Sequence, residues 1–374
     1  MVATVYHLLD EKEPFSERDG GAISRWAANV LRDGQEVIVC TATDPSWGFP
    51  KARVICLPGY KLSGYVHAGT YRSSWPLQLP LYTRVFAALL ARLQPGDIVY
   101  VHNRPAYAAV FATHASRLGF GVVLHMHNSL LLAASRGQLK ALQTVPMVFC
   151  SRFLQAEAEA GIGPRVGRSF TVYNGADDTV FYPDGGQGAA RCATIIYTGR
   201  LVAYKGVHIL LQAMALLHRE RVGVRCRIVG TAGFGRNRRT RYTRSLERMK
   251  PPNCEFVGYC SGRTVADVLR EADIFCCPSI WNDPFPLAPL EAMATGLPIV
   301  ASRVGGIPEA LASGGGNLVS PNDPETLAAA LRHLVENPTV RGEMGAAAYK
   351  SFKTRFNWTI IRQQYEDVLV KSAT

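Results

Sequence analysis

The chain has 374 residues, of which 48% are hydrophobic and 19% are charged. This length predicts about two to three domains, and the composition excludes a disordered chain because it supplies enough apolar side chains for packed cores. No run of about 18 uncharged apolar residues occurs, so we expect no membrane-spanning helix. The start of the chain has no basic segment, and acidic residues interrupt its apolar run, so we expect no secretory signal.

The nine cysteines are scattered, and none has the C-x-x-C or Cys/His spacing of a zinc site. They predict buried, reduced thiols in a cytoplasmic protein. The net charge of +12 is concentrated in residues 235–250, which hold seven basic residues and one acidic residue. A solvated face, a contact with anionic membrane or lipid-linked substrate, and a nucleic-acid surface are the alternatives. Because one tyrosine alone interleaves the arginines, we expect no nucleic-acid partner.

In the first half of the chain, short runs of β-branched residues alternate with helical periodicity. Such alternation predicts a parallel sheet built from βαβ units. The expected strands are 2–9, 36–41, 97–102 and 122–127. The expected helices are 23–31, 81–93 and 106–118.

The same alternation starts again after residues 182–188, a turn-rich and polar stretch that predicts a linker. The expected strands are 194–198, 225–229, 274–277 and 298–302, and the expected helices are 206–217, 264–272, 287–294, 324–336 and 356–370. Two halves of this kind predict two doubly wound α/β domains that face each other, with a ligand between the carboxyl ends of the strands.

Two carboxylates flank a predicted helix start in the segment DPFPLAPLE, where Asp283 lies in a loop and Glu291 lies eight positions further on. The free N–H groups at a helix start suit a phosphate, and Glu291 could accept hydrogen bonds from a ribose diol. Asp283 would then lie beside the group beyond the phosphates. An ordinary acidic residue near a helix start is the alternative interpretation.

Two cations, Arg200 and Lys205, follow the strand predicted at 194–198 and precede a helix. Positive charges at the end of a strand and beside a helix start can neutralise a diphosphate through charge-assisted hydrogen bonds. The spacing differs from that of a P-loop. A pair of surface cations is the alternative interpretation.

Glycine-rich loops follow two of the predicted strands. Gly20 and Gly21 precede the first helix, where a backbone without side chains could approach a phosphate. Gly230, Gly233 and Gly235 spell GxxGxG, which is not the GxGxxG fingerprint of a nicotinamide site. Plain strand-to-helix turns are the alternative for both loops.

His125, His127 and Asn128 form a polar group at the end of the strand predicted at 122–127. Because the carboxyl ends of parallel strands border the ligand site, His127 could bond a sugar hydroxyl. Two histidines separated by one residue could also hold a metal, but the sequence shows no third ligand nearby, so we expect no metal site. An Asp-x-Asp pair that would bind a divalent ion is also absent from the sequence.

These motifs, taken together and in this order, resemble a GT-B retaining glycosyltransferase of family 4. The resemblance covers nearly the whole chain and is to bacterial enzymes of surface-polysaccharide, spore-coat or lipopolysaccharide assembly. It is carried by the GG loop, His-x-His-Asn, the segment YNGAD at 173–177 with Phe181, GR-L-x3-KG, the segment VGY at 257–259, and acid-x7-Glu291-AMA-x-GLP.

The resemblance implies a role for each matching residue. Arg200 and Lys205 match the diphosphate-binding pair, and Asp283 matches the acid that contacts the transferred sugar. His127 matches the histidine near the sugar and the acceptor. The resemblance also implies positions that bind the phosphates, the nucleobase and the ribose of the donor. These positions are Gly21, Gly230, Gly258, Tyr259, Phe285, Pro286, Leu287 and Glu291.

Two departures from the family pattern bear on the choice of sugar. Asp283 stands where the family has Glu, and is one methylene shorter. Pro286 replaces a common Gly, which removes one amide donor and stiffens the loop. Neither change removes the groups that transfer needs.

The resemblance implies an N-terminal acceptor-side domain over 1–180, a C-terminal nucleotide-sugar-binding domain over 181–355, and a helix over 356–374 that crosses back to the first domain. Both domains would be Rossmann-like and would face each other across a cleft. The implied activity is metal-independent transfer, without an organic cofactor, of a hexose or N-acetylhexosamine from a nucleoside diphosphate sugar, with UDP favoured over GDP.

The acceptor would be a hydroxyl of a glycan or lipid-linked molecule in surface glycan assembly. The location would be cytoplasmic, with peripheral contact at the anionic inner face of the membrane. The apolar positions of the helix predicted at 81–93 would contribute to that contact, but core packing is the favoured explanation for them. A sugar-nucleotide epimerase of the same fold and a non-catalytic assembly or coat protein are the alternatives.

Overall fold

The structure is a computed structural model that describes residues 3–9, 15, 21–32, 34–40, 53–56, 87–163, 167–184, 192–233, 239–260 and 262–373. Most of the linker predicted at 182–188, the Gly20 position and the first part of the helix predicted at 81–93 lie outside these residues. The chain divides into two compact units, the first comprising 1–150, 154–172 and 364–374, and the second comprising 151–153 and 173–363.

The first unit contains a seven-stranded parallel sheet in the order β3-β2-β1-β4-β5-β6-β7. The central strands are buried because their β-branched and aromatic side chains are covered on both faces. The strands are β1 (Val5–Leu8), β2 (Glu36–Cys40), β3 (Arg53–Cys56), β4 (Ile98–His102), β5 (Gly121–Met126), β6 (Met147–Phe149) and β7 (Ser169–Thr171).

Helices of the first unit pack on this sheet. Trp26 of α1 (Ala22–Val30) and Tyr365 of α13 (Trp358–Ala373) contact the histidine-bearing face of the sheet. The other helical segments of this part of the chain are α3 (Pro105–Leu118), η1 (Ser129–Ala133), α4 (Arg136–Ala141) and α5 (Arg152–Ile162). The helix α3 packs against β5 and α4.

The second unit contains a six-stranded parallel sheet in the order β10-β9-β8-β11-β12-β13. Its central strands are also buried and rich in Ile, Val and Cys, as is typical of a sheet with both faces covered. The strands are β8 (Ala193–Thr198), β9 (Val224–Val229), β10 (Cys254–Gly258), β11 (Ile274–Cys277), β12 (Ile299–Ser302) and β13 (Gly316–Val319).

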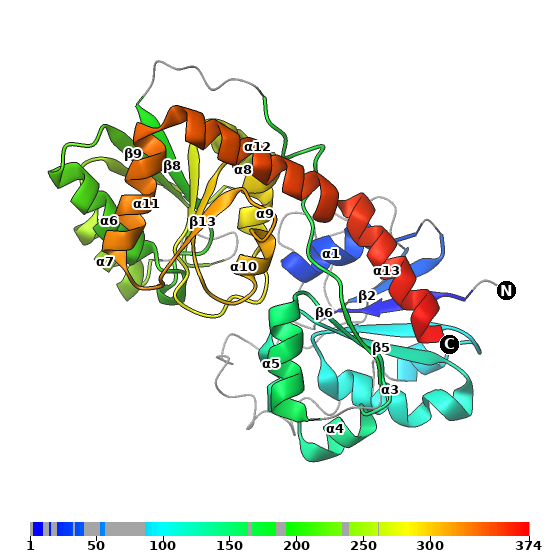
Figure 1. Cartoon of the computed structure of the whole chain (residues 1–374). Coiled ribbons are helices and arrows are strands. Elements are labelled where there is room, and N and C mark those ends of the chain that lie inside the picture. Colours follow the sequence, from blue (N-terminus) through cyan, green and yellow to red (C-terminus); the bar gives the residue numbers. More distant parts are fainter. Residues whose placement is uncertain are drawn as a thin grey trace. The chain divides into compact units, whose positions relative to one another are not determined.

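Two groups of helices cover the second sheet, α11 packing on α6 and α12 on α9 (Figure 1). The buried core on one side is formed by α6 and α11 with the strands beneath them. The helical segments are η2 (Ala203–Lys205), α6 (Val207–Arg219), α7 (Arg241–Met249), α8 (Arg263–Arg270), α9 (Leu287–Ala294), α10 (Ile307–Ala310), α11 (Pro324–Glu336) and α12 (Pro338–Arg355).

Every strand and helix predicted from the sequence overlaps an observed element, with bounds that differ by a few residues. Of the helix predicted at 81–93, residues 87–90 are helical within the described part. The long helix α12 was not predicted, because its buried residues include Gly345, Ala348 and Ser351, which leave no apolar stripe for the sequence to show. Strands β6 and β7 were missed because each has three residues.

Two further predictions concern membrane-spanning helices and the state of the cysteines. Within the described residues, no helix combines the length and the apolar character that a bilayer span requires. All nine cysteines fall in the described ranges, and each of them is a free thiol. The prediction that they are buried is wrong for Cys56 and Cys192, which are exposed, and for Cys260, which is half-buried.

Candidate functional site

The predicted diphosphate residues lie where the strand order of the second sheet reverses. The chain continues from β8 outward through β9 and β10, and then returns to the other side of β8 with β11. Arg200 and Lys205 follow β8, and Asp283 lies in the loop that follows β11. Ligands of open α/β sheets bind at such a reversal, outside the carboxyl ends of the strands.

The side chains of Lys205 and Asp283 form an ion pair at this point. Lys205 is half-buried and Asp283 is buried. The guanidinium of Arg200 donates a hydrogen bond to the hydroxyl of Tyr204, whose ring packs edge-on against Trp281 at 5.1 Å between centroids. The structure therefore brings together the two predicted cations and the predicted sugar-contacting acid in one small region.

Glycines allow the two loops of this region to approach each other closely. Gly206 has a left-handed backbone with φ of 71°, and a Cβ placed there would lie 1.8 Å from the carbonyl oxygen of Pro278. Gly305 also has a positive φ, and its Cβ would lie 2.0 Å from the Asp283 carbonyl oxygen. Larger residues at either position would displace the loop that carries Asp283.

The same loop leads into α9, on which Glu291 lies about one turn from the start. Pro286 is the N-cap and makes no side-chain hydrogen bond to the helix, so it does not cap the amides of Leu287 and Ala288, while Pro289 has no N–H to offer. The carbonyl of Phe285 accepts a hydrogen bond of 2.8 Å from Asn174 Nδ2, and its ring packs 4.9 Å from that of Tyr173. These contacts fix the loop immediately before Leu287.

Gly230 and Gly258 end β9 and β10, beside the end of β8. The amide of Gly230 donates to the carbonyl of Gly258 at 2.7 Å, and a Cβ on Gly230 would lie 1.8 Å from the carbonyl oxygen of Gly199. Tyr259 follows with 40% of its surface exposed, which leaves its ring free to stack on a planar group. The predicted nucleobase positions thus lie along the same sheet edge as Arg200.

The first unit contributes the two remaining predicted residues. Gly21 is the extended N-cap of α1, in the segment that follows β1 at the point where the first sheet reverses its strand order. His127 follows β5. It lies in a histidine cluster, defined here as His7, His102, His125 and His127.

Three members of the cluster, His102, His125 and His127, are held as neutral imidazoles. Burial lowers the pKa of His127 to about 3, and burial is also the largest cause that lowers the pKa values of His102 and His125 well below the usual range. Each of these three rings offers one nitrogen within 4.8 Å of the others, which is a set that could hold a metal ion. His102 is the third imidazole that the sequence spacing did not reveal, because it comes from the neighbouring strand β4 in register with His125.

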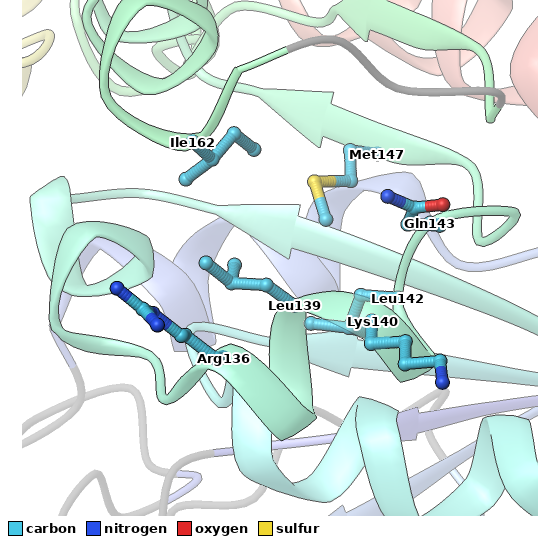
Figure 2. Close-up of a pocket in the computed structure, with 7 residues that line it drawn as sticks. All are labelled: Arg136, Leu139, Lys140, Leu142, Gln143, Met147 and Ile162. Atoms are coloured by element: carbon cyan, nitrogen blue, oxygen red, sulfur yellow. The ribbon is translucent and has the colours of Figure 1, made fainter.

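A surface cavity of about 170 Å³ lies in the first unit, away in sequence from every predicted site residue. Figure 2 shows Leu139 of α4, Met147 of β6 and Ile162 of α5 bordering it, with Arg136 and Lys140 projecting from α4. Its lining contains no carboxylate, histidine, hydroxyl or thiol, so we assign it no catalytic chemistry.

Comparison with known proteins shows a family likeness within the second unit. Residues 190–351 match the family model for glycosyl transferases group 1. Spore coat protein SA of Bacillus subtilis is 27% identical over 220 residues, which cover 54% of this chain and 58% of that protein. The chain spans about half the length of the curated relatives that it matches.

Two solved structures resemble nearly the whole chain. Sucrose-phosphate synthase from Thermosynechococcus elongatus has a TM-score of 0.79 at 20% identity, with 98% of each chain covered. HepE of Anabaena, solved in complex with UDP and glucose, has a TM-score of 0.74 at 20% identity and covers 98% of this chain and 99% of its own. With the two parallel-sheet units, this likeness confirms the predicted GT-B fold.

Several residues that hold the site were missed from the sequence. Asn174 and the Gly305–Gly306 pair position the loop around Asp283, yet they resemble ordinary turn residues. His7 and His102 lie inside apolar strands, where a single polar residue gives no signal of its partners. Pairing between strands that lie 95 residues apart brings these two rings together.

Proposed function

We propose that the protein is a metal-independent, retaining glycosyltransferase. It moves a hexose or N-acetylhexosamine from a nucleoside diphosphate sugar, UDP before GDP, to a hydroxyl acceptor in surface glycan assembly. The observation that carries this proposal is the grouping of Arg200, Lys205 and Asp283 at the strand reversal of the unit that matches glycosyl transferases group 1. The UDP and glucose bound by HepE support the choice of donor.

In the proposed reaction, the bond between the sugar C1 and the diphosphate oxygen breaks, and a bond from the acceptor oxygen to C1 forms on the same face. The acceptor's proton passes to an oxygen of the leaving diphosphate. Arg200 and Lys205 stabilise the charge that develops on that diphosphate, and such preorganised cations act most strongly where charge appears in the transition state. Glu291 would hold the ribose, and Asp283 would contact the sugar.

The resemblance also implies roles for Gly21 and His127, which lie in the first unit. Because the pKa of His127 is lowered to about 3, this ring stays neutral near pH 7 and would accept a hydrogen bond from a hydroxyl instead of removing its proton. The leaving diphosphate is then the base for the acceptor.

A thermal-shift panel of nucleotides and nucleotide sugars tests donor binding first. A ligand at about 100 times its dissociation constant adds about 2.7 kcal/mol of stability, which a melting curve detects. We expect UDP to stabilise the protein more than GDP and much more than adenine nucleotides. Incubation of the stabilising UDP-sugar with hydroxyl acceptors, followed by NMR of the anomeric proton, then tests transfer and retention. Absence of stabilisation by every nucleotide would favour the non-catalytic alternative.

We also propose peripheral contact with an anionic membrane, where a lipid-linked acceptor would be found. Arg241, Arg244 and Arg248 of α7 are exposed and raise the local positive charge. Co-sedimentation with anionic and neutral vesicles should show binding to anionic vesicles alone, falling steeply as salt rises because the screening length is about 8 Å at physiological ionic strength. Lack of binding at low salt would leave these arginines as a solvated face.

A further inference from the structure

A continuous row of hydrogen-bonded side chains crosses the first sheet from β2 to the end of β5. The carboxylate Oε2 of Glu36 lies 3.2 Å from His7 Nε2, and His7 Nδ1 lies 3.1 Å from His102 Nε2. His102 Nδ1 in turn lies 3.1 Å from His127 Nε2. We call this series the Glu36–His127 row. The residues Glu36, His7 and His102 are buried.

The chemistry of imidazole gives such a row a direction. A neutral ring has one nitrogen that donates and one that accepts, so each bond in the row fixes the roles of the next pair. Burial keeps His102 and His127 neutral by lowering their pKa values. The proton position on one ring therefore determines the proton position on its neighbour.

Glu36 sets the direction because an ionised carboxylate can only accept. Burial acts to raise the pKa of Glu36, but hydrogen bonds and charges from His7 and Arg32 outweigh it, so that the pKa lies below its usual value. Arg32 Nε lies 2.7 Å from Oε1 and Tyr365 donates to the same oxygen at 3.0 Å. The row requires His7 to donate from Nε2 and to accept at Nδ1, and Arg32 balances the charge of Glu36.

We propose that Glu36 acts through His7 and His102 to fix His127 as the Nε2–H tautomer, which leaves Nδ1 as an acceptor for a ligand hydroxyl. Glu36, His7 and His102 are thus positioning residues for His127. The identity of the ligand as a sugar or its acceptor rests on the proposed function. Nδ1 of His127 is buried and meets no hydrogen-bond partner among the described residues, and a hydroxyl supplies the missing donor.

A metal ion held by His102, His125 and His127 is the competing interpretation of the same cluster. In the row, both nitrogens of His102 already have imidazole partners, and Trp26 packs 4.5 Å from His125 between ring centroids. A bound cation would require the nitrogens that face it to be unprotonated. The tautomers therefore separate the two interpretations.

Long-range ¹⁵N–¹H correlation spectra of the full chain labelled with [¹⁵N]histidine report each tautomer directly. Single substitutions such as H127Q and H102Q assign the signals. We expect a protonated Nε2 and an unprotonated Nδ1 for His127. The reverse tautomer, or a loss of the Nε2 proton on addition of Zn²⁺ at one equivalent, would overturn the proposal without any measurement of activity.

Substitution E36Q tests whether Glu36 determines the tautomer of His127. Arg32 Nε and Tyr365 donate to Oε1 at 2.7 and 3.0 Å, whereas Oε2 accepts one longer bond of 3.3 Å from the Arg32 amide. The amide oxygen should therefore stay at the Oε1 position, and the amide NH₂ should face His7 Nε2. Every bond in the row then reverses, and we expect His127 to carry its proton on Nδ1. The matched control is R32K, which keeps both the positive charge beside Glu36 and the carboxylate, and it should keep the Nε2–H tautomer. An unchanged tautomer in E36Q would overturn the proposal.

Activity gives the second readout. E36Q should lower kcat/KM for sugar transfer at least tenfold and leave the affinity for UDP within twofold, because Arg200 and Lys205 are untouched. E36D, which keeps an accepting carboxylate, should recover part of the loss. If E36Q does not fold, the wild-type spectrum still decides the tautomer. A wild-type protein with the expected tautomer but without sugar transfer would contradict the proposed function and leave the row intact.

Discussion

The ammonium group of Lys205 already has a carboxylate partner in Asp283, so a diphosphate at this point would share the cation with it. We predict that K205A lowers turnover about 10²–10³-fold and weakens binding of the nucleoside diphosphate, because one preorganised cation is lost. K205R should recover only part of the lost turnover and binding, since a planar guanidinium does not replace a compact ammonium. Initial rates and calorimetric titration with UDP measure both effects.

The exposed cation Lys350 on α12 provides the matched control, and K350A should change neither quantity. Part of the effect of K205A arises because Asp283 is left buried without its cation. The double variant K205A/D283N should therefore lose less transition-state stabilisation than the sum of the losses in the two single variants. Unchanged UDP affinity and rate in K205A would remove this residue from the site.

A second prediction at the residue scale concerns how the stability of the fold depends on pH. Unfolded histidine binds a proton near pH 6.5, whereas His127 in the folded protein does so at about pH 3, and the pKa values of His102 and His125 are also lowered. Between these limits the unfolded state holds more protons. The free energy of unfolding should therefore fall as pH decreases below 6.5, by up to about 1.4 kcal/mol per pH unit for each ring.

Urea unfolding at pH 7.5, 6.5 and 5.5 measures this slope. H127Q should make it shallower, whereas H218Q, at an exposed position on α6, should leave it unchanged. Equal slopes for wild type and H127Q would show that His127 does not bind its proton differently in the two states.

The sequence predicted Arg200, Lys205, Asp283 and His127 because each follows a strand at a spacing that carries chemical meaning. It could not predict the Glu36–His127 row. Glu36 and His7 lie on neighbouring strands whose pairing is set by register, and sequence separation says nothing about which buried polar groups meet across a sheet. The contact between His7 and Tyr365 joins residues 358 positions apart.

At the scale of elements, the turn between η2 and α6 determines where Lys205 lies. We predict that G206A lowers the free energy of unfolding by at least about 2 kcal/mol, because a positive φ costs about 1–3 kcal/mol for a residue with a side chain and the new Cβ would collide with the Pro278 carbonyl. Thermal or urea unfolding checks this value.

G223A is the matched control, because Gly223 has nothing within 4 Å of a new Cβ. It should leave stability within about 0.5 kcal/mol of the wild type. A G206A variant as stable as G223A would show that the loop carrying Pro278 yields without cost, and that Lys205 is not fixed by this turn.

At the scale of the whole molecule, the alternation of strands and helices was enough to predict two doubly wound parallel sheets, because buried parallel strands are continuous apolar runs. The elements that escaped prediction are those whose stability comes from tertiary packing. The helix α10 has four residues, and β13 begins with Gly316, which fits because its Cβ would lie 2.7 Å from the Ile299 carbonyl.

We predict that sugar transfer continues in excess EDTA at an unchanged rate. The sequence lacks an Asp-x-Asp pair, and Arg200 and Lys205 provide the positive charge that a divalent ion would otherwise supply at the diphosphate. Rates with EDTA, with EDTA plus Mn²⁺ and without additions make the comparison. Loss of transfer in EDTA that Mn²⁺ restores would show that a cation takes part.

The helix α13 has a consequence for how the protein is made. Tyr365 belongs to the first unit and bonds to the buried Glu36, yet the ribosome synthesises it after all but a few residues of the chain. Residues 173–363, which form nearly all of the second unit, emerge before it. The first unit therefore completes its contacts with α13 only after the second unit has been synthesised, although N-terminal domains usually fold first during translation. In a purified chain truncated after residue 363, the second unit should resist protease while the first unit is cleaved more readily than in the full chain.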